Sequence, residues 1–213
     1  ELELSALKAQ MNPHFVFNAL GAIQYFIQTN DVEAADNNLT RFARLMRKYL
    51  DSSKEKMVSL KDEIELLSIY TDLEKMRFED LFTTEIEIDS DIQTEDTFLP
   101  SMIIQPFVEN AVNHGLPMRK DKKGILKIKI TKSNNVLLCH ITDNGIGRQQ
   151  AQKLKWKGHQ SKGLAIVTEK LNTLRSSGLA DVIVDINDLN PTDKTYPGTQ
   201  VSVKIKNLED EFI

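Results

Sequence analysis

The stretch Q-M-N-P-H-F-V-F-N, residues Gln10–Asn18, interrupts one helical pattern and starts another. Because Pro13 has no backbone N–H and its ring clashes with the preceding turn, a helix through this stretch must kink or restart. The apolar residues change face at the same point. We expect His14 to lie opposite the new apolar face, in line with Asn18 one turn later. A neutral imidazole held outward on a helix is a usable nucleophile, so His14 is a candidate catalytic residue.

Composition excludes several classes of protein. The chain has 213 residues and a formal net charge of −4, which gives no general attraction to nucleic acid or to an anionic membrane. The single cysteine, Cys139, excludes an internal disulfide and fits a reducing cytosol. No apolar run approaches the roughly 20 residues that span a bilayer. The first ten residues already have helical periodicity and no initiator methionine, so we expect the natural protein to continue upstream.

The first eighty residues are predicted to be helical. A first helix runs from about residue 2 to 28, and a second carries apolar residues in steps of three and four (Ala35, Leu39, Phe42, Met46 and Tyr49). A third begins after Ser59, an N-cap residue, and ends near Phe78. These helices are too poor in apolar residues for a core of their own, so we expect two copies to form a four-helix bundle. Its core would contain residues of the first and third helices (Val16, Leu20, Ile23, Ile27, Leu60, Ile64 and Leu67).

The pattern changes near residue 81 to that of a sheet with helices. The expected elements are a strand at 82–88, a helix from Leu99 to about His114 closed by Gly115, strands at 125–131 and 136–143 joined by a hairpin, a helix at 162–176, and strands at 182–186 and 200–205. This order indicates a mixed sheet with helices on one face. The predicted fold class is therefore α+β, with a helical domain over residues 1–80 and an α/β domain over residues 81–213.

Three polar side chains fall on one predicted helix face in Gln105–Gly115, Q-P-F-V-E-N-A-V-N-H-G. Asn110, Asn113 and His114 are three and four residues apart, which places them together on an α-helix. An Asn oxygen is a suitable ligand for Mg²⁺ that bridges substrate phosphates, and Asn113 and His114 could reach phosphate or ribose oxygens. Glu109, in the same segment, is a further candidate catalytic residue. A helix whose polar face meets only solvent would use the same residues.

The segment D-N-G-I-G, Asp143–Gly147, follows a predicted strand. Asp143 is an acceptor suited to the amino group of adenine. Gly145 and Gly147 allow the backbone to bend tightly and to approach a ligand closely. A plain turn would use the same residues, so this segment is informative only beside the others.

A third candidate site is Ser161–Leu164, S-K-G-L, at the predicted start of a helix. Free N–H groups and the helix dipole favour phosphate there, so Lys162, Gly163 and Leu164 are candidate nucleotide contacts. The preceding loop, 149–160, is lysine-rich and long enough to close over a nucleotide as a lid.

Taken together, these segments resemble the LytS/YehU-like sensor histidine kinases over nearly the whole chain. L-K-A-Q-M-N-P-H-F-V-F-N looks like the phosphoacceptor motif of that family, which implies phosphorylation at His14. P-F-V-E-N-A-V-N-H-G resembles the Asn motif of histidine-kinase and gyrase-type ATPases and implies Asn110 as the Mg²⁺ ligand. D-N-G-I-G looks like their adenine-binding motif, with Asp143 as the adenine contact. P-G-T, which ends at Thr199, is similar to the start of the closing strand and implies that Thr199 lies near the adenine.

Two positions depart from the patterns of related kinases. Many histidine kinases have an acidic general base directly after the phosphoacceptor, where this chain has Phe15, so the base stays unassigned. The lid motif usually has a second glycine two positions before the one that matches Gly163. Ser161 occupies that position here, so lid closure or affinity could differ.

The resemblance implies the core of a two-component sensor histidine kinase with a Bergerat/GHKL-type ATP-binding domain. It would use ATP and Mg²⁺ to phosphorylate His14, with Asn18 orienting the phosphoryl group, and then pass the phosphate to an aspartate of a response regulator of the LytTR type. The expected state is a homodimer that binds no nucleic acid directly. The expected location is the cytoplasmic domain of an inner-membrane sensor, attached through an upstream segment. Two alternatives stay open: a degenerate kinase that serves as a dimeric scaffold, and a GHKL ATPase without histidine autophosphorylation.

Overall fold

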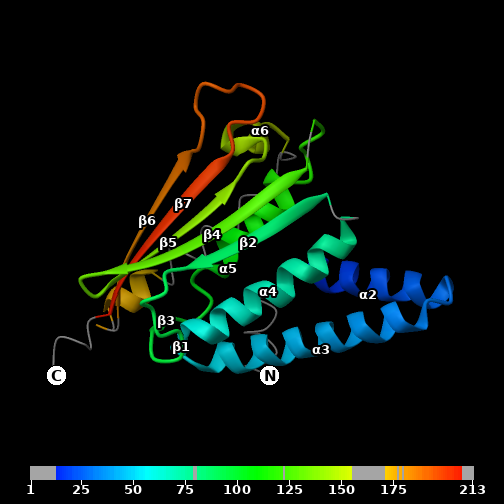
Figure 1. The fold of residues 1–213 in the computed structure, drawn as a ribbon, viewed down its shortest axis with the longest axis horizontal. Helices are drawn as coiled ribbons and strands as arrows, with labels where there is room; N and C mark the ends of the chain where they lie inside the picture. The colour runs from blue at the N-terminus through cyan, green and yellow to red at the C-terminus, as the bar shows by residue number, and fades with distance from the viewer. Residues whose placement is uncertain are drawn as a thin grey trace.

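A computed structural model of the chain describes residues 13–78, 81–121, 123–154, 171–176, 178 and 180–207. The helices are α2 (Pro13–Gln28), α3 (Val32–Lys54), α4 (Leu60–Arg77), α5 (Gln105–Asn110), the π-helix η1 (Ala111–Gly115) and α6 (Gly147–Leu154). The strands are β1 (Met57–Ser59), β2 (Phe82–Ile88), β3 (Phe98–Pro100), β4 (Gly124–Ser133), β5 (Val136–Asp143), β6 (Ala180–Asp188) and β7 (Thr199–Asn207). The long helices gather at one end of the molecule and the sheet at the other (Figure 1).

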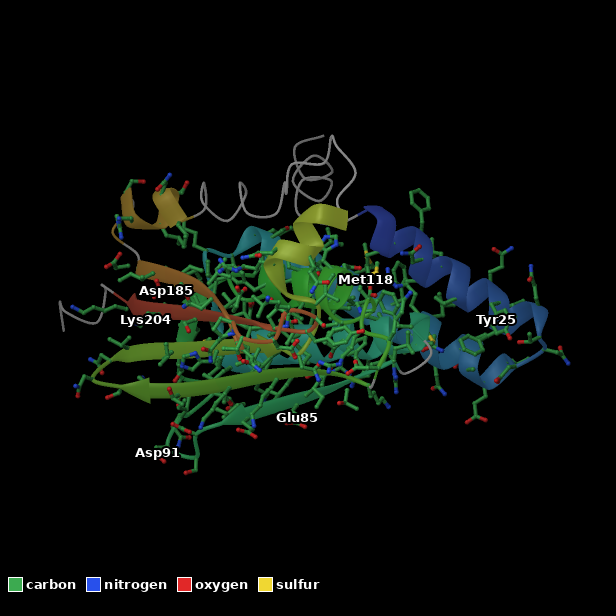
Figure 2. The ribbon with its side chains drawn as sticks, turned by 90° about the horizontal axis from the view of Figure 1, so that it is seen from above. Tyr25, Glu85, Asp91, Met118, Asp185 and Lys204 are labelled. Carbon is green, nitrogen blue, oxygen red and sulfur yellow. The ribbon has the colours of Figure 1, made fainter. Side chains whose placement is uncertain are left out.

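The apolar stripe of α2 packs inside its own chain. Phe15, Ala19 and Ile23, four residues apart, are buried, which is the spacing of one helix face. Leu20 and Ile27, which the sequence analysis assigned to the same face, are 44% and 62% exposed. The predicted face was therefore too wide, and part of α2's apolar surface remains uncovered in the single chain. Figure 2 shows Tyr25 of this helix at the end of the molecule remote from Asp185 and Lys204 of the sheet.

Helix α4 lies between α3 and the sheet edge at β2 (Figure 1). Its N-cap is Ser59, whose hydroxyl accepts from the Asp62 N–H, and its C-cap is Phe78, in agreement with the predicted start and end. Leu60 and Leu67 are fully buried in the single chain. They are therefore already covered within one chain, and their predicted contribution to the core of a two-copy bundle stays a prediction.

The described strands include a mixed five-stranded sheet in the order β2-β4-β5-β7-β6. β2 pairs parallel with β4, and the other pairs are antiparallel. Alternate residues of β4, β5 and β7 are buried toward the helices (Leu126, Ile128, Ile130, Leu137, Cys139, Ile141, Val201, Val203 and Ile205). α5 and α6 lie on one face of the sheet, as both views show (Figures 1 and 2). The hairpin between β4 and β5 turns at Asn134 and Asn135, whose φ angles of 48° and 59° suit a two-residue turn.

A short second sheet corrects two sequence predictions. Met57–Ser59 pairs antiparallel with Phe98–Pro100, so the first eighty residues are not entirely helical and Leu99-Pro100 does not start a helix. The helix begins instead at Gln105, with Pro106 in its first turn. A proline near a helix start was the correct signal. The segment contains two prolines, and because Pro100 pairs with a distant strand, the helix starts next to Pro106 instead.

The loop predicted before the lid helix begins with a helix. α6 occupies Gly147–Leu154, so the first part of the predicted loop at 149–160 is helical. Its polar composition gave no apolar stripe to reveal the helix. Residues 155–170, with most of the predicted helix at 162–176, lie outside the described residues; residues 171–176 are helical.

Most of the buried apolar side chains of the described residues form one continuous cluster, from Phe15 on α2 through Tyr70 on α4 to Val203 on β7. The predicted α+β class is confirmed, and the sheet with helices on one face agrees with the GHKL type that the resemblance implied. Because the two halves share this core, the boundary near residue 80 stays a prediction. Among the described helices, none combines the length and apolarity needed to cross a bilayer.

A buried carboxylate on α4 holds the segment that precedes α5. Glu63 is 1% exposed, and its two oxygens accept from the backbone N–H groups of Met102 (3.0 Å) and Ile104 (3.2 Å). Met102 has a φ of 53°, an unusual conformation for a residue with a side chain. The carboxylate stabilises this bend because it satisfies two N–H groups that have no access to water.

We expect Glu63→Gln to lower the free energy of unfolding by about 1–3 kcal/mol, because the Gln amide nitrogen cannot accept from one of the two N–H groups. Urea denaturation followed by circular dichroism measures this loss. Asp72→Asn, an exposed acid-to-amide change on the same helix, is the control and should stay within about 0.5 kcal/mol of the parent. Equal effects of the two changes would contradict the role of Glu63.

Candidate functional site

Three segments that are far apart in the sequence meet around Asp143. This carboxylate ends β5, is 5% exposed, and its Oδ1 accepts from the N–H of Gly145 at 2.9 Å. Thr199, the first residue of β7, pairs with Asp143 across the ladder and hydrogen-bonds its carboxylate. Gly115, at the end of η1, packs against the same carboxylate. The structure thus brings the Asn segment, the D-N-G-I-G segment and the P-G-T segment into one site.

Glycines make this convergence possible. A Cβ on Gly115 would lie 2.8 Å from Oδ1 of Asp143, and one on Gly145 would lie 2.3 Å from the Gly115 carbonyl oxygen. Gly198, with a φ of 65°, is equally close to the main chain of Asp143. A side chain at Gly145 or Gly198 would force backbone segments apart, and one at Gly115 would displace the Asp143 carboxylate. The sequence analysis recognised Gly145 but missed Gly115 and Gly198, whose role depends on contacts between segments.

The electrostatics of Asp143 follow from its burial. Loss of water raises the pKa of Asp143 to about 6, and the hydrogen bonds from Gly145 and Thr199 oppose this rise. The carboxylate is therefore mostly ionised at neutral pH, and it can act as a hydrogen-bond acceptor in a site shielded from water.

The Asn segment departs from the regular helix that the sequence predicted. After Asn110 the helix widens into the π turn η1, closed by a hydrogen bond from the Leu116 N–H to the Ala111 carbonyl at 3.0 Å. Asn113 consequently faces α4, while His114 is exposed and Asn110 half-buried. The regular α-helix on which the shared face was based is not what forms here, because a π turn changes the angular spacing of its side chains. The shared face itself stays a prediction.

The Asn113 amide is held by three protein groups. Its Oδ1 accepts from Nη2 of Arg77 at 2.8 Å, and its Nδ2 donates to the Tyr70 hydroxyl at 3.2 Å and to the Glu109 carbonyl at 2.9 Å. A direct contact of Asn113 with a nucleotide therefore stays a prediction, and the amide would have to give up present partners to make it. Tyr70 and Arg77 were missed because their spacing in the sequence is that of ordinary core and helix-end residues.

Glu109 is turned toward α3. Its Oε1 accepts from the hydroxyl of Tyr49 and from Nε2 of Gln105, both at 3.1 Å. Burial raises the pKa of Glu109, and these two donors oppose the rise. The arrangement gives the carboxylate a role in fixing α5 against α3, and its catalytic role stays a prediction.

The phosphoacceptor region is described only in part. His14 is the second residue of α2, and its side chain lies outside the described residues. Asn18, one turn later, is half-buried. The predicted lid contacts Lys162, Gly163 and Leu164 also lie outside the described residues.

Arg119 is a further polar anchor that no motif revealed. Its guanidinium donates to the carbonyl of Asn144, the residue after Asp143, and also to Asp121. It lies over the ring of Tyr196, 4.5 Å from the centroid. Arg119 thus joins the segment after η1 to the turn that carries Asp143 and to the loop before β7.

The arrangement fits an adenine nucleotide. Asp143 offers a buried acceptor with the Thr199 hydroxyl beside it, where three glycines let the backbone segments come close. Within the described ranges, no cluster of three His, Cys, Asp or Glu side chains could hold a metal ion by itself. A cation held by one Asn oxygen and by the phosphates of a ligand needs no such cluster, so Asn110 remains suited to Mg²⁺.

Comparison with known proteins gives matches to one kind of enzyme. The family model described as "Histidine kinase" matches residues 2–82. The sensor protein LytS of Oceanobacillus iheyensis is 36% identical over 150 residues, which cover 70% of this chain and 25% of that protein. The sensor protein LytS of Staphylococcus saprophyticus is 32% identical over 218 residues, which cover 100% of this chain and 35% of that protein. The chain therefore spans well under half the length of these relatives.

Among solved structures, the histidine kinase domain of the Erythrobacter litoralis EL346 blue-light activated histidine kinase has a TM-score of 0.47 and 12% sequence identity. The alignment covers 93% of this chain and 97% of that one. This structural similarity is too low to support any conclusion beyond those drawn from the sequence matches.

Glu74 lies on α4, three residues before the Arg77 that holds Asn113, and its carboxylate is almost fully buried. It pairs with Arg77 at 2.7 Å and is 1% exposed. Burial raises the pKa of Glu74 to about 7, against the opposing effect of the Arg77 charge. The folded protein therefore holds a proton on this carboxyl between pH 4.5 and 7, where the unfolded chain has lost it.

We expect the contribution of Glu74 to stability to be complete below pH 4.5 and to be lost as the pH rises through about 7. Glu74→Gln, which stays neutral, should flatten the fall in unfolding free energy between pH 5 and 8 by at most about 3 kcal/mol. Urea titrations at four pH values test this. Glu65→Gln is the control, since ion pairs with Lys48 and Arg44 lower the pKa of Glu65 and its titration lies outside this range. Parallel pH profiles for the parent and Glu74→Gln would refute the assignment.

Proposed function

Since the chain belongs to the LytS-like sensor histidine kinases, as its motifs predicted, we propose that it transfers the γ-phosphoryl group of ATP to His14 and then to an aspartate of a response regulator. The observation that carries this proposal is the convergence of Gly115, Gly145 and Thr199 around the buried carboxylate of Asp143. The family match over residues 2–82, which include His14, supports the acceptor.

In the proposed site Asp143 accepts a hydrogen bond from the adenine amino group. Thr199 lies on the neighbouring strand and helps to hold the carboxylate in place. Asn110 would hold Mg²⁺, which neutralises charge on the phosphates. The predicted lid contacts Lys162 and Gly163 would supply positive charge and N–H groups to the same phosphates.

The chemical step exchanges one bond to phosphorus for another. The bond between the γ-phosphorus and the bridging oxygen breaks, its electron pair leaves with ADP, and a bond forms between phosphorus and a nitrogen of His14. Asn18, one turn along α2, would orient the phosphoryl group. A second transfer moves the group to a carboxylate oxygen of a response regulator, for which the family resemblance suggests the LytTR type.

The proposed location is the cytoplasmic part of a sensor that reaches the inner membrane through segments outside this chain. The relatives are sensor proteins in which this chain matches only a part, which supports such an arrangement. No direct contact with nucleic acid is proposed, in line with the net charge of −4.

A homodimer through α2 accounts for the uncovered part of that helix. Phe17 is 73% exposed, and Leu20 and Ile27, on the same side of the helix, are 44% and 62% exposed. Large apolar side chains repeated along one helix mark an interaction surface. A second copy of α2 is the proposed partner, with these side chains in place of the buried Ile23 of the original prediction.

Labelling with γ-³²P-ATP and Mg²⁺ tests the kinase. We expect the parent to gain a label that is stable to base and labile to acid, which is the behaviour of phosphohistidine. His14→Gln should abolish the label and leave ADP affinity within about twofold, since that residue is outside the nucleotide site, whereas Asp143→Ala should lose both label and affinity.

The same experiment separates the alternatives. Release of inorganic phosphate without any label would indicate a GHKL ATPase. Absence of both label and hydrolysis, with the dimer retained, would indicate a scaffold. Full labelling of His14→Gln would move the acceptor to one of the other histidines (His114, His140 or His159).

We expect Phe17→Glu to convert the dimer to a monomer, because an unpaired carboxylate in an apolar interface costs several kcal/mol. Light scattering of the purified chain at tens of micromolar measures the mass. Ile183→Glu, an exposed apolar-to-acid change on β6, is the matched control and should stay dimeric. A parent that is monomeric, or a Phe17→Glu variant that stays dimeric, would reject this interface.

A further inference from the structure

The π turn η1 is held from outside by side chains of α4. A π turn is less favourable than an α-helical turn and persists only where its surroundings stabilise it. Tyr70 and Arg77 provide such support, because both hydrogen-bond the amide of Asn113 in the middle of the turn. The same amide also donates to the Glu109 carbonyl at the point where the helix widens.

The π turn determines the position of the proposed nucleotide contacts on both sides. Asn110 directly precedes it, and Gly115 ends it. The Gly115 carbonyl accepts from the N–H of Ile146 at 3.3 Å, and a Cβ on Gly115 would lie 2.8 Å from Oδ1 of Asp143. A turn that relaxed to regular α-helix would shift Gly115 away from Asp143 and rotate it relative to Asn110.

We propose that Tyr70 and Arg77 are positioning residues of the nucleotide site, which act through Asn113 to keep η1 in its π form. The inference rests on the proposed function in that the site is one for Mg²⁺ and an adenine nucleotide. It goes further, because it gives the helical half of the chain control over nucleotide affinity through named side chains.

The network also reaches the acceptor helix. The ring of Phe15, the residue after His14, packs on the ring of Tyr70 with centroids 5.1 Å apart. Arg77 is fixed at the same place by its ion pair with Glu74 and by the ring of Phe78, 3.9 Å from its guanidinium carbon. Movement of α2 against α4 therefore reaches Tyr70, one of the two side chains that hold Asn113.

Amide hydrogen exchange of the nucleotide-free chain tests the hold on the π turn directly. Tyr70→Phe keeps the packed ring and removes only the hydroxyl. We expect exchange in residues 111–116 to become about three- to tenfold faster, as for the loss of one buried hydrogen bond. The matched control is Tyr49→Phe, which removes another buried hydroxyl but one that bonds Glu109 and Gln105, and it should leave exchange in 111–116 unchanged. Unchanged exchange in Tyr70→Phe would overturn the inference.

Calorimetric titration with Mg·ADP tests the consequence for binding. We expect Tyr70→Phe to weaken affinity about three- to tenfold and Arg77→Met about tenfold or more, with Arg77→Lys partly restoring it. Tyr49→Phe should stay within about twofold of the parent. In an Asn113→Ala background, Tyr70→Phe should cause no further loss, because its partner is gone.

Each other outcome is also decisive. An equal loss from Tyr70→Phe with and without Asn113 would show that the hydroxyl acts elsewhere and would overturn the inference. Loss of binding in Asn113→Ala together with normal binding in Tyr70→Phe would also overturn it, in favour of Asn113 as a direct ligand. A parent chain that binds no Mg·ADP would refute the proposed function itself, whereas normal parent binding with unchanged Tyr70→Phe would refute only the positioning role.

Discussion

Burial of polar side chains on α4 is the constraint that ties the two halves of this chain together. A polar group removed from water needs a partner inside the protein, since its lost hydration otherwise destabilises the fold. Glu63 finds its partners in the backbone before α5. Tyr70 and Arg77 find theirs in Asn113. All of these partners lie beyond residue 100, so the helical half cannot rotate against the sheet without leaving buried groups unpaired.

The proposed nucleotide site depends on close contacts between chain segments, which are possible because the residues in contact are glycines without side chains. Gly115, Gly145 and Gly198 come from three segments, and each packs where a Cβ would meet backbone or the Asp143 carboxylate. The buried carboxylate in turn depends on Gly145 and Thr199 for its hydrogen bonds. The segments therefore support one another, and the acceptor that adenine would use stays dry, fixed and mostly ionised at neutral pH.

The sequence predicted well what depends on local pattern. Alternating apolar residues located β2, β4 and β5 and the hairpin that joins β4 to β5, and Ser59 located the start of α4. The sequence predictions failed where a segment distant in the chain determines the local structure. Phe98–Pro100 became a strand because Met57–Ser59 pairs with it, and η1 became a π turn where a regular helix was expected. The contribution of α2 to the core was also misjudged, since Leu20 and Ile27 are exposed, whereas Leu60 and Leu67 of α4 are buried within the single chain.

The sequence by itself determined the family, the α+β class and the residue types of the site, because these follow from periodicity and from motifs of a few adjacent residues. It pointed to Asp143, Asn110 and His14 without any coordinates. Only the tertiary structure decided that Asn113 faces α4, that Glu109 faces α3, and that the tyrosines Tyr49 and Tyr70 reach the Asn segment. The physical reason is that a buried polar side chain is oriented by whichever partner the fold brings within about 3 Å of it, and that partner lies tens of residues away in the chain.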